Sequence, residues 1–219
     1  MRFQTPEGEI EIFPSKIICL LRNYAAHAEE LGNTVPERMV YFLKPPSSLL
    51  PSGGTVLIPP DVGVVHHEVE LAVVIGKKGK SIPRERAMDH VLGFTVMLDI
   101  TARDVQDEFK RKGWPWTIPK GYDTFAPIGR EIVMDYDHHN RRIWLEVNGT
   151  LRQDGNTSMM IYDVDEIISE VSRVMTLLPG DIILTGTPPG VGPLQSGDRV
   201  RAGVDGITPL EVSVEEWRE

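Results

Sequence analysis

The segment His66-His67-Glu68-Val69-Glu70-Leu71-Ala72-Val73-Val74-Ile75-Gly76 is the part of this 219-residue chain that most strongly predicts its fold. Its apolar, β-branched residues predict a buried strand that ends at Gly76. Side chains alternate between the two faces of a strand, so Glu68 and Glu70 share one face. Two carboxylates at the mouth of so apolar a strand are costly to bury without a partner, and a cation is the partner that fits. The segment makes a metalloenzyme the leading hypothesis.

The composition argues against several classes of function. The formal net charge is −9 and no long basic cluster occurs, so we expect no nucleic-acid partner. No apolar run approaches the ~18 residues of a membrane span, and the N-terminus does not resemble a signal peptide. The single cysteine, Cys19, excludes a disulfide within the chain and is expected to be a small buried hydrophobe. We therefore expect a cytoplasmic protein that has no membrane partner.

Clusters of proline and glycine divide the chain into short segments and favour a fold rich in strands. Asn148-Gly149, between apolar segments at 142–147 and 150–153, is a strong hairpin signal. Further strands are predicted at 17–21, 91–100, 182–184, 199–204 and 210–214.

Only a few short helices are predicted. One covers 23–31, a second begins at Thr101 and a third begins at Asp163, the last with an apolar face that includes Val171 and Val174. Thr101 with Asp104, and Asp163 with Glu166, resemble capping boxes. The predicted fold is α+β and mostly β: a mixed β-roll or distorted β-barrel that forms a single domain over residues 1–219.

A third carboxylate, Asp99, ends the strand predicted at 91–100. Together with Glu68 and Glu70 it would give three oxygen donors, a set that suits Mg²⁺, Mn²⁺ or Ca²⁺. The lack of a nearby cysteine pair or of two histidines at helical spacing argues against structural zinc. His66 lies on the Glu68 face and is a candidate ligand or supporting group. The alternative is that the two glutamates form an ordinary solvated face.

His27 and Glu30 form a second candidate site. On a helix, residues three apart are neighbours, so Glu30 would orient the imidazole and hold a water molecule against it. The alternative is a surface pair that has no catalytic role.

Six segments in order resemble the fumarylacetoacetate hydrolase family, closest to its small acylpyruvate hydrolase and oxaloacetate decarboxylase type. The resemblance covers nearly the whole chain. It implies that the chain has the mixed β-roll fold of the family's C-terminal domain. The matching segments are Arg22-Asn23-Tyr24 with His27 and Glu30, Phe42-Leu43-Lys44-Pro45, His67 to Leu71, Asp99 to Gln106, Lys120 to Thr124, and Thr185 to Gly192.

The resemblance implies a role for each of these positions. It implies that Mg²⁺ or Mn²⁺ is the cofactor, with Ca²⁺ as a substitute in crystals, and that the protein is a homodimer. It implies a mobile lid at 22–38 that carries the pair of water-activating residues. Leu21 stands where the family often has glycine, which makes the substrate assignment less direct than the metal assignment. The implied residues are Glu68, Glu70 and Asp99 as metal ligands, His27, Glu30 and Lys120 as catalytic groups, and Arg22, Arg103, Gln106 and Thr187 as substrate-binding groups.

The implied substrate is a small 2-oxo acid. Because the His27–Glu30 pair is present, we expect cleavage of the C–C bond of a 3-acylpyruvate through a metal-stabilised enolate. Two alternatives use the same enolate: decarboxylation of oxaloacetate, and isomerisation or decarboxylation of 2-hydroxyhepta-2,4-diene-1,7-dioate. An alternative of a different class is a non-catalytic β domain that is stabilised by Ca²⁺.

Overall fold

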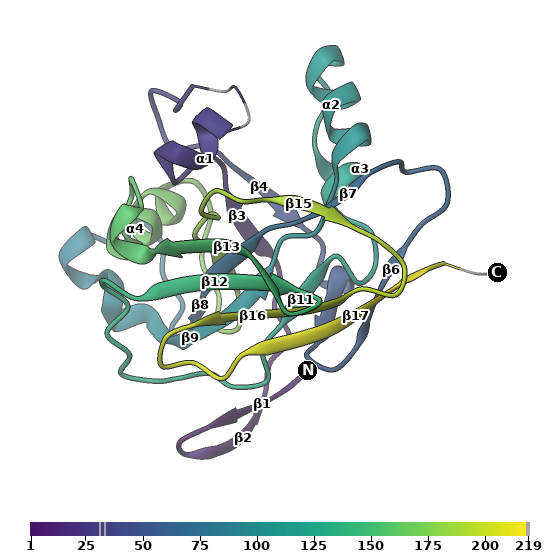
Figure 1. The fold of residues 1–219 in the computed structure, drawn as a ribbon. Helices are drawn as coiled ribbons and strands as arrows, with labels where there is room; N and C mark the ends of the chain where they lie inside the picture. Colours follow the sequence, from purple (N-terminus) through teal and green to yellow (C-terminus); the bar gives the residue numbers. More distant parts are fainter. Residues whose placement is uncertain (31, 33, 218–219) are drawn as a thin grey trace.

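The computed structural model describes residues 1–30, 32 and 34–217, and over these residues strands predominate (Figure 1). This confirms the mostly-β prediction. Four α-helices and three short 3₁₀ helices are found in the described residues: α1 (Ala25–Glu30), α2 (Arg103–Lys112), α3 (Thr117–Lys120), α4 (Val164–Val174), and the 3₁₀ helices Pro46–Ser48, Arg84–His90 and Thr157–Met159.

The strands of the described chain form two large sheets, a three-stranded sheet and an N-terminal hairpin. The seven-stranded sheet has the order β4 (Tyr41–Lys44), β3 (Ile17–Leu20), β14 (Ile182–Leu184), β8 (Val69–Ile75), β9 (Val91–Leu98), β11 (Ala126–Ile128) and β5 (Leu49–Pro51). The five-stranded sheet has the order β13 (Thr150–Asn156), β12 (Arg142–Val147), β16 (Arg199–Val204), β17 (Leu210–Glu216) and β6 (Thr55–Ile58). The three-stranded sheet joins β10 (Thr101–Ala102), β7 (Val65–His67) and β15 (Gly192–Leu194), and the hairpin is β1 (Arg2–Thr5) with β2 (Gly8–Glu11).

The apolar core occupies both faces of the seven-stranded sheet. Every residue of β8 is buried, which is typical of a central strand that is covered on both sides. One face packs against the five-stranded sheet and α4, and the other receives Phe3 and Ile12 from the N-terminal segment. Cys19 is buried on this second face, as predicted.

The segment 66–76 is two strands instead of the single strand predicted. Val65–His67 pairs in the three-stranded sheet, whereas Val69–Ile75 pairs in the seven-stranded sheet, and Glu68 lies between them. The alternation of residue types does not reveal this break, because the change of pairing partner depends on distant strands. Glu68 therefore lies where the chain passes from one sheet to another.

The turn and strand signals are mostly confirmed. Asn148 and Gly149 have φ of 51° and 74°, the left-handed conformation that a two-residue hairpin turn requires. The Asp163 side chain accepts a hydrogen bond from the Glu166 backbone N–H at 3.3 Å and caps α4. The apolar face of α4 is shorter than predicted, because Val174 is 66% exposed.

Two helix predictions are corrected. Thr101 and Asp104 do not cap α2: the Thr101 hydroxyl donates to the Asp99 carbonyl, and the Asp104 carboxylate accepts from Val64 N–H at 3.0 Å. Side-chain partners elsewhere in the chain thus replace the local cap. The helix predicted at 23–31 spans Ala25–Glu30, and residue 31 lies outside the described residues.

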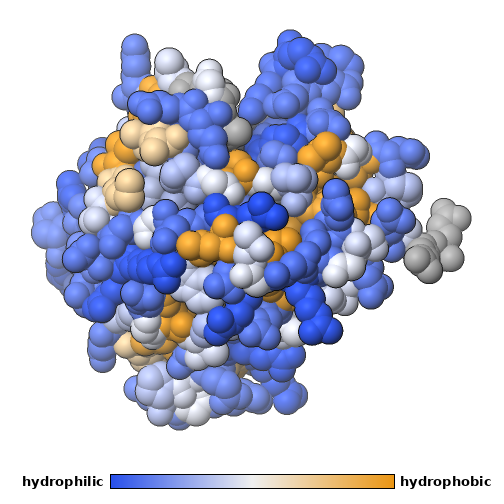
Figure 2. All heavy atoms as spheres, viewed as in Figure 1, coloured by the Kyte–Doolittle hydropathy of each residue, from blue (hydrophilic) through white to orange (hydrophobic). Residues whose placement is uncertain are grey.

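Helices α1 and α2 stand at the same end of the molecule, above the ends of the central strands (Figure 1). The space-filling view shows a hollow between them, bordered mainly by hydrophilic surface (Figure 2). Among the described helices, none has both the length and the apolar character needed to cross a membrane.

Candidate active site

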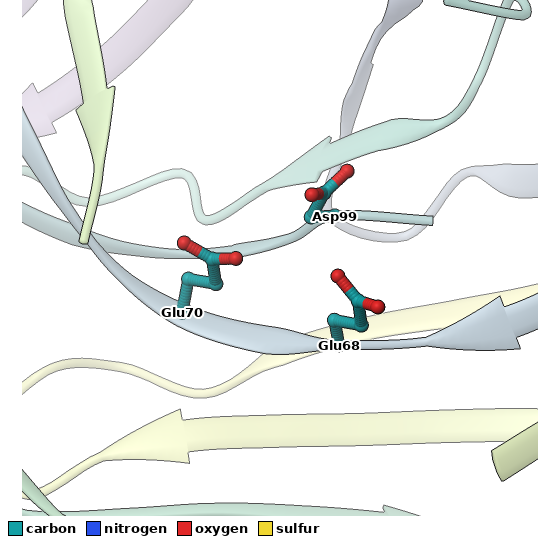
Figure 3. Close-up of side chains that lie close together, drawn as sticks. All are labelled: Glu68, Glu70 and Asp99. Carbon is teal, nitrogen blue, oxygen red and sulfur yellow. The ribbon is translucent and has the colours of Figure 1, made fainter. Parts of the chain in front are cut away.

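Three buried carboxylates converge at the bottom of the site. Oxygens of Glu68, Glu70 and Asp99 lie within 4.8 Å of one another, and the three side chains point into the same space (Figure 3). The register of β8 with β9 explains this arrangement, because Glu70 is opposite Met97 and the Asp99 N–H donates to the Glu68 carbonyl at 2.8 Å. The structure therefore brings together the three ligands predicted from the sequence.

Three buried cations surround two of these carboxylates. Lys120 Nζ donates to Glu68 at 2.9 Å and to Asp99 at 2.6 Å, and Lys44 Nζ donates to the other Asp99 oxygen at 2.5 Å. The Arg103 guanidinium donates to the second Glu68 oxygen. Burial alone would raise the pKa of Glu68, but Lys120 and Arg103 outweigh it and hold that pKa far below the usual range.

The negative charge of Glu70 has fewer partners than those of Glu68 and Asp99. In the described residues its carboxylate has one hydrogen-bond donor, the Gly186 backbone N–H at 2.5 Å. Burial, followed by the charges of Asp99 and Glu68, raises the pKa of Glu70 well above its usual value. An added cation would relieve this repulsion, and three hard oxygen donors suit Mg²⁺, Mn²⁺ or Ca²⁺. The residues present thus fit a divalent ion.

The predicted acid–base pair lies on α1. His27 Nδ1 is 3.3 Å from Glu30 Oε2, and the Glu30 carboxylate also accepts from the Gly190 backbone N–H at 2.9 and 3.1 Å. His27 is buried and lines the same cavity as the acid cluster. Glu30 therefore fixes the imidazole and also joins α1 to the loop that carries Thr187.

The remaining predicted residues line this cavity as well. Arg103 Nη1 donates to Gln106 Oε1 at 2.6 Å, which joins two of the predicted substrate-binding groups. Arg22 has φ of 55°, where the chain turns from β3 toward α1, and its guanidinium donates to the Thr34 carbonyl. His66 is not part of the acid cluster, since its Nδ1 accepts from Arg103 Nε at 3.2 Å. The cavity is lined by Leu20, Leu21, Arg22, His27, Phe42, Glu68, Glu70, Asp99, Arg103, Gln106, Lys110, Trp116, Lys120 and Thr187.

Three residues of the site have no role predicted from the sequence. Lys44 belongs to one of the six segments that resemble the family, and its place at the end of a short strand is the only local signal. Lys110 lies in α2, one turn after the predicted Gln106, and lines the cavity. Gln153 is fully buried in β13 behind the Thr187 loop, and no local pattern distinguishes it from other strand residues.

Two glycines let the Thr187 loop lie directly on β13. A Cβ on Gly155 would lie 2.6 Å from Pro188 Cβ, and a Cβ on Gly190 would lie 2.1 Å from the Arg152 carbonyl oxygen. Both distances are shorter than any ordinary contact, so only glycine allows this approach. The five-stranded sheet thereby supports one wall of the cavity.

Comparison with known proteins agrees with this geometry. The model of the fumarylacetoacetate hydrolase C-terminal family matches residues 16–215. An oxaloacetate tautomerase, the mitochondrial FAHD1 of Arabidopsis thaliana, is 50% identical over 203 residues, which cover 92% of this chain and 91% of that protein. A mitochondrial oxaloacetate decarboxylase of Dictyostelium discoideum is 50% identical over 195 residues, covering 88% and 89%.

A similar solved structure is that of a fumarylpyruvate hydrolase from Pseudomonas aeruginosa in complex with Mn²⁺ and pyruvate. It is 36% identical, covers 99% of this chain and 96% of its own, and superposes with a TM-score of 0.91. The family match spans most of the chain and the relatives cover it almost end to end. The chain therefore belongs to the fumarylacetoacetate hydrolase family.

Proposed function

We propose that this chain is a Mg²⁺- or Mn²⁺-dependent enzyme that acts on a small 2-oxo diacid, with the keto–enol interconversion of oxaloacetate as the leading reaction. The observation that carries the proposal is the buried cluster of Glu68, Glu70 and Asp99 with Lys120 against it. The choice of oxaloacetate is supported by the names of two relatives that are 50% identical to the chain.

The balance of charges favours a substrate with two carboxylates. Three buried carboxylates face three buried cations, Lys44, Arg103 and Lys120, so a bound divalent ion would leave a surplus of about two positive charges. A dianion such as oxaloacetate would neutralise the surplus, whereas a monocarboxylate would not.

A divalent ion held by Glu68, Glu70 and Asp99 would supply the positive charge that stabilises the enolate form of a 2-oxo acid. Lys120 adds a second positive group beside that charge. Arg103 and Gln106 bind a substrate carboxylate from the other side of the cavity, and Thr187 adds a hydroxyl.

His27 takes and returns the proton of the substrate carbon, oriented by Glu30. The contact of Glu30 with Gly190 N–H holds α1 over the cavity and limits the entry of water. Residues 22–38 are proposed to be the lid that opens when this contact breaks.

Hydrolysis of a 3-acylpyruvate is the second candidate. It is supported by the His27–Glu30 pair, which can activate a water molecule, and by the similarity to the Pseudomonas hydrolase. In this reaction the water attacks the distal carbonyl and pyruvate leaves as its enolate. Decarboxylation of oxaloacetate requires the same enolate but no attacking water.

A substrate panel with and without metal tests the proposal. Oxaloacetate tautomerisation, oxaloacetate decarboxylation, and cleavage of acetylpyruvate and fumarylpyruvate are followed in EDTA and after Mg²⁺ or Mn²⁺ is restored. We expect chelation to abolish turnover without unfolding the protein. Glu68→Gln and Asp99→Asn should abolish ion binding and every activity, while the exposed control Glu85→Gln should not.

Turnover that is unaffected by EDTA would contradict the metal-dependent mechanism. Unfolding on chelation, with no turnover at any time, would instead support the Ca²⁺-stabilised β domain. We also infer a homodimer from the resemblance to the family and a cytoplasmic location from the sequence, although both relatives described above are named as mitochondrial proteins. Light scattering on the purified protein tests the dimer.

A further inference from the structure

Gln153 makes every hydrogen bond that its amide can make, and it lies behind the cavity wall. Its Oε1 accepts from Val69 N–H at 3.1 Å and lies 3.0 Å from His67 Nδ1. Its Nε2 donates to Thr187 Oγ1 at 2.8 Å and to the Pro188 carbonyl at 2.9 Å. One fully buried side chain thus connects Val69, the residue between the candidate ligands Glu68 and Glu70, with the Thr187 loop.

The orientation of this amide is determined by one partner that can only donate a hydrogen bond and one that can only accept. A backbone N–H such as that of Val69 can only donate, and the Pro188 carbonyl can only accept. The amide oxygen must therefore face Val69, and the NH₂ group must face Pro188. It follows that His67 donates from Nδ1 and that Thr187 Oγ1 accepts from Gln153.

This assignment determines what the Thr187 hydroxyl can offer to a substrate. An amide nitrogen is not an acceptor, so the hydroxyl proton cannot point back at Gln153. No other described residue accepts a hydrogen bond from it, and Thr187 lines the cavity that contains the acid cluster. The hydroxyl is therefore left as a donor toward the cavity, where a substrate carboxylate is an acceptor.

We propose that Gln153 is a positioning residue that holds the Thr187 hydroxyl as a hydrogen-bond donor to a substrate carboxylate. The inference rests on the proposed function, because it requires a carboxylate-bearing substrate in this cavity. Gln153 itself does not touch the substrate. It acts by donating a hydrogen bond to Thr187 Oγ1, which leaves the hydroxyl proton for the substrate, and by keeping the Thr187–Pro188 segment against β13.

The test is a double-mutant cycle in the Mn²⁺-loaded enzyme with oxaloacetate as substrate. Gln153→Glu keeps an acceptor for Val69 but removes both donors, so the Thr187 hydroxyl donates its hydrogen bond to the new carboxylate and turns away from the cavity. Thr187→Val removes the hydroxyl with little change of shape. Because a hydrogen bond to a charged group is lost in each case, we expect KM to rise by about 10- to 100-fold in either variant. We expect kcat and the Mn²⁺ dissociation constant to change by less than about threefold.

The cycle separates an effect through Thr187 from a general structural one. If Gln153 acts through Thr187, the double variant has the same KM as Thr187→Val alone. Thr187→Ser, which keeps the hydroxyl, should restore a KM near that of the wild type. Gln195→Glu, an exposed control that adds the same charge, should leave KM unchanged.

Several results would overturn the inference. One is that the two single effects on KM multiply in the double variant. Another is that Gln153→Glu leaves KM unchanged. If Gln153→Glu does not fold, Gln153→Met is used, and its KM should lie between those of the wild type and Thr187→Val.

The Thr187 variants do not depend on the stability of the Gln153 variants, and an unchanged KM in Thr187→Val would also overturn the inference. Absence of any Mn²⁺-dependent turnover in the wild type contradicts the proposed function instead. The two failures are therefore distinguishable.

Discussion

At the residue scale, Lys120 stands out because it bridges Glu68 and Asp99, two of the three candidate ligands. The attraction of these carboxylates outweighs burial and raises the pKa of Lys120, so the side chain stays protonated. A charged lysine limits the repulsion between the two carboxylates while the protein folds. The same ammonium group is then adjacent to the substrate oxygens in the proposed mechanism.

The acid–base pair gives a prediction that separates hydrolysis from decarboxylation. His27→Ala removes the group that activates water, and such groups typically contribute about 10²- to 10⁴-fold to the rate. We expect acetylpyruvate hydrolysis to fall by about 10²-fold or more, while oxaloacetate decarboxylation stays within about tenfold of wild type. Steady-state rates for both substrates measure this, with the exposed His139→Ala as control. Hydrolysis of acetylpyruvate at the wild-type rate would show that His27 does not activate water.

The candidate ligands could be predicted from the sequence because their pattern is local. Glu68 and Glu70 are two residues apart where β8 begins, and Asp99 directly follows β9. Lys44 and Gln153 could not be assigned in this way, because their partners lie 55 and 84–86 residues away in the sequence. A buried lysine or glutamine has functional meaning only once the fold shows which groups it contacts.

At the element scale, the loop after β14 keeps its position because it packs very closely against β13. Gly190 has φ of 99°, and its N–H holds Glu30 of α1. The loop therefore connects the five-stranded sheet below it to the helix above the cavity. A change at this position would affect both contacts.

Gly190→Ala tests this role. The added Cβ would lie 2.1 Å from the Arg152 carbonyl oxygen, so the loop must move and the hydrogen bond to Glu30 is lost. We expect kcat/KM to fall by about tenfold or more and the free energy of unfolding to drop by about 1–3 kcal/mol. Gly197→Ala is a matched control, because Gly197 has φ of 95° with no atom within 4 Å of the added Cβ. Equal loss of activity in both variants would mean that backbone strain, and not loop position, matters.

Elements with a strong local signal were predicted well. The Asn148-Gly149 hairpin and the Asp163 cap of α4 follow from neighbouring residues alone. The break at Glu68 and the missing cap of α2 could not be predicted, because distant strands and the Val64 backbone decide them. Prediction failed where contacts distant in the sequence compete with local ones.

At the scale of the whole molecule, the acid cluster is part of the core that both large sheets form. A divalent ion that binds only the folded state must stabilise the entire fold. At a concentration of Mn²⁺ about 100 times the dissociation constant, the expected gain is about 2.7 kcal/mol, or roughly 5–10 °C in Tm. Differential scanning calorimetry measures this, and EDTA should reverse the gain without unfolding the protein at 25 °C. No change of Tm with Mn²⁺ would argue against an ion at the cluster.

Acid should destabilise the fold through His138. Its ring is buried and stacks on Phe94 at 5.0 Å, and burial, followed by the charge of His139, lowers the pKa of His138 from 6.5 to about 4. Because the folded-state pKa is lower than the unfolded value, protons bind the unfolded chain first, so stability falls as pH drops from about 6.5 toward about 4. We expect His138 alone to contribute a loss of about 2 kcal/mol between about pH 7 and about pH 5.

Urea unfolding at the two pH values measures this loss. His138→Phe keeps the stacked ring without the titrating group and should show a smaller loss of stability. His139→Asn removes the neighbouring charge that also lowers the pKa of His138, so its loss should lie between those of the wild type and His138→Phe. An identical pH dependence in His138→Phe and the wild type would assign the effect to other groups.

The passage of the chain between two sheets at Glu68 has an implication for engineering. The acid cluster lies on and directly beside the central strands β8 and β9, whereas much of the cavity wall comes from α1, α2 and the loop after β14. The wall segments lie outside these central strands. Each can therefore be replaced by the corresponding segment of a relative while the central strands are left unchanged. A chimera that receives residues 22–38 and 104–112 from a fumarylpyruvate hydrolase, and keeps Arg103 because it contacts Glu68, would then inherit the donor's substrate range and retain the metal affinity of this chain.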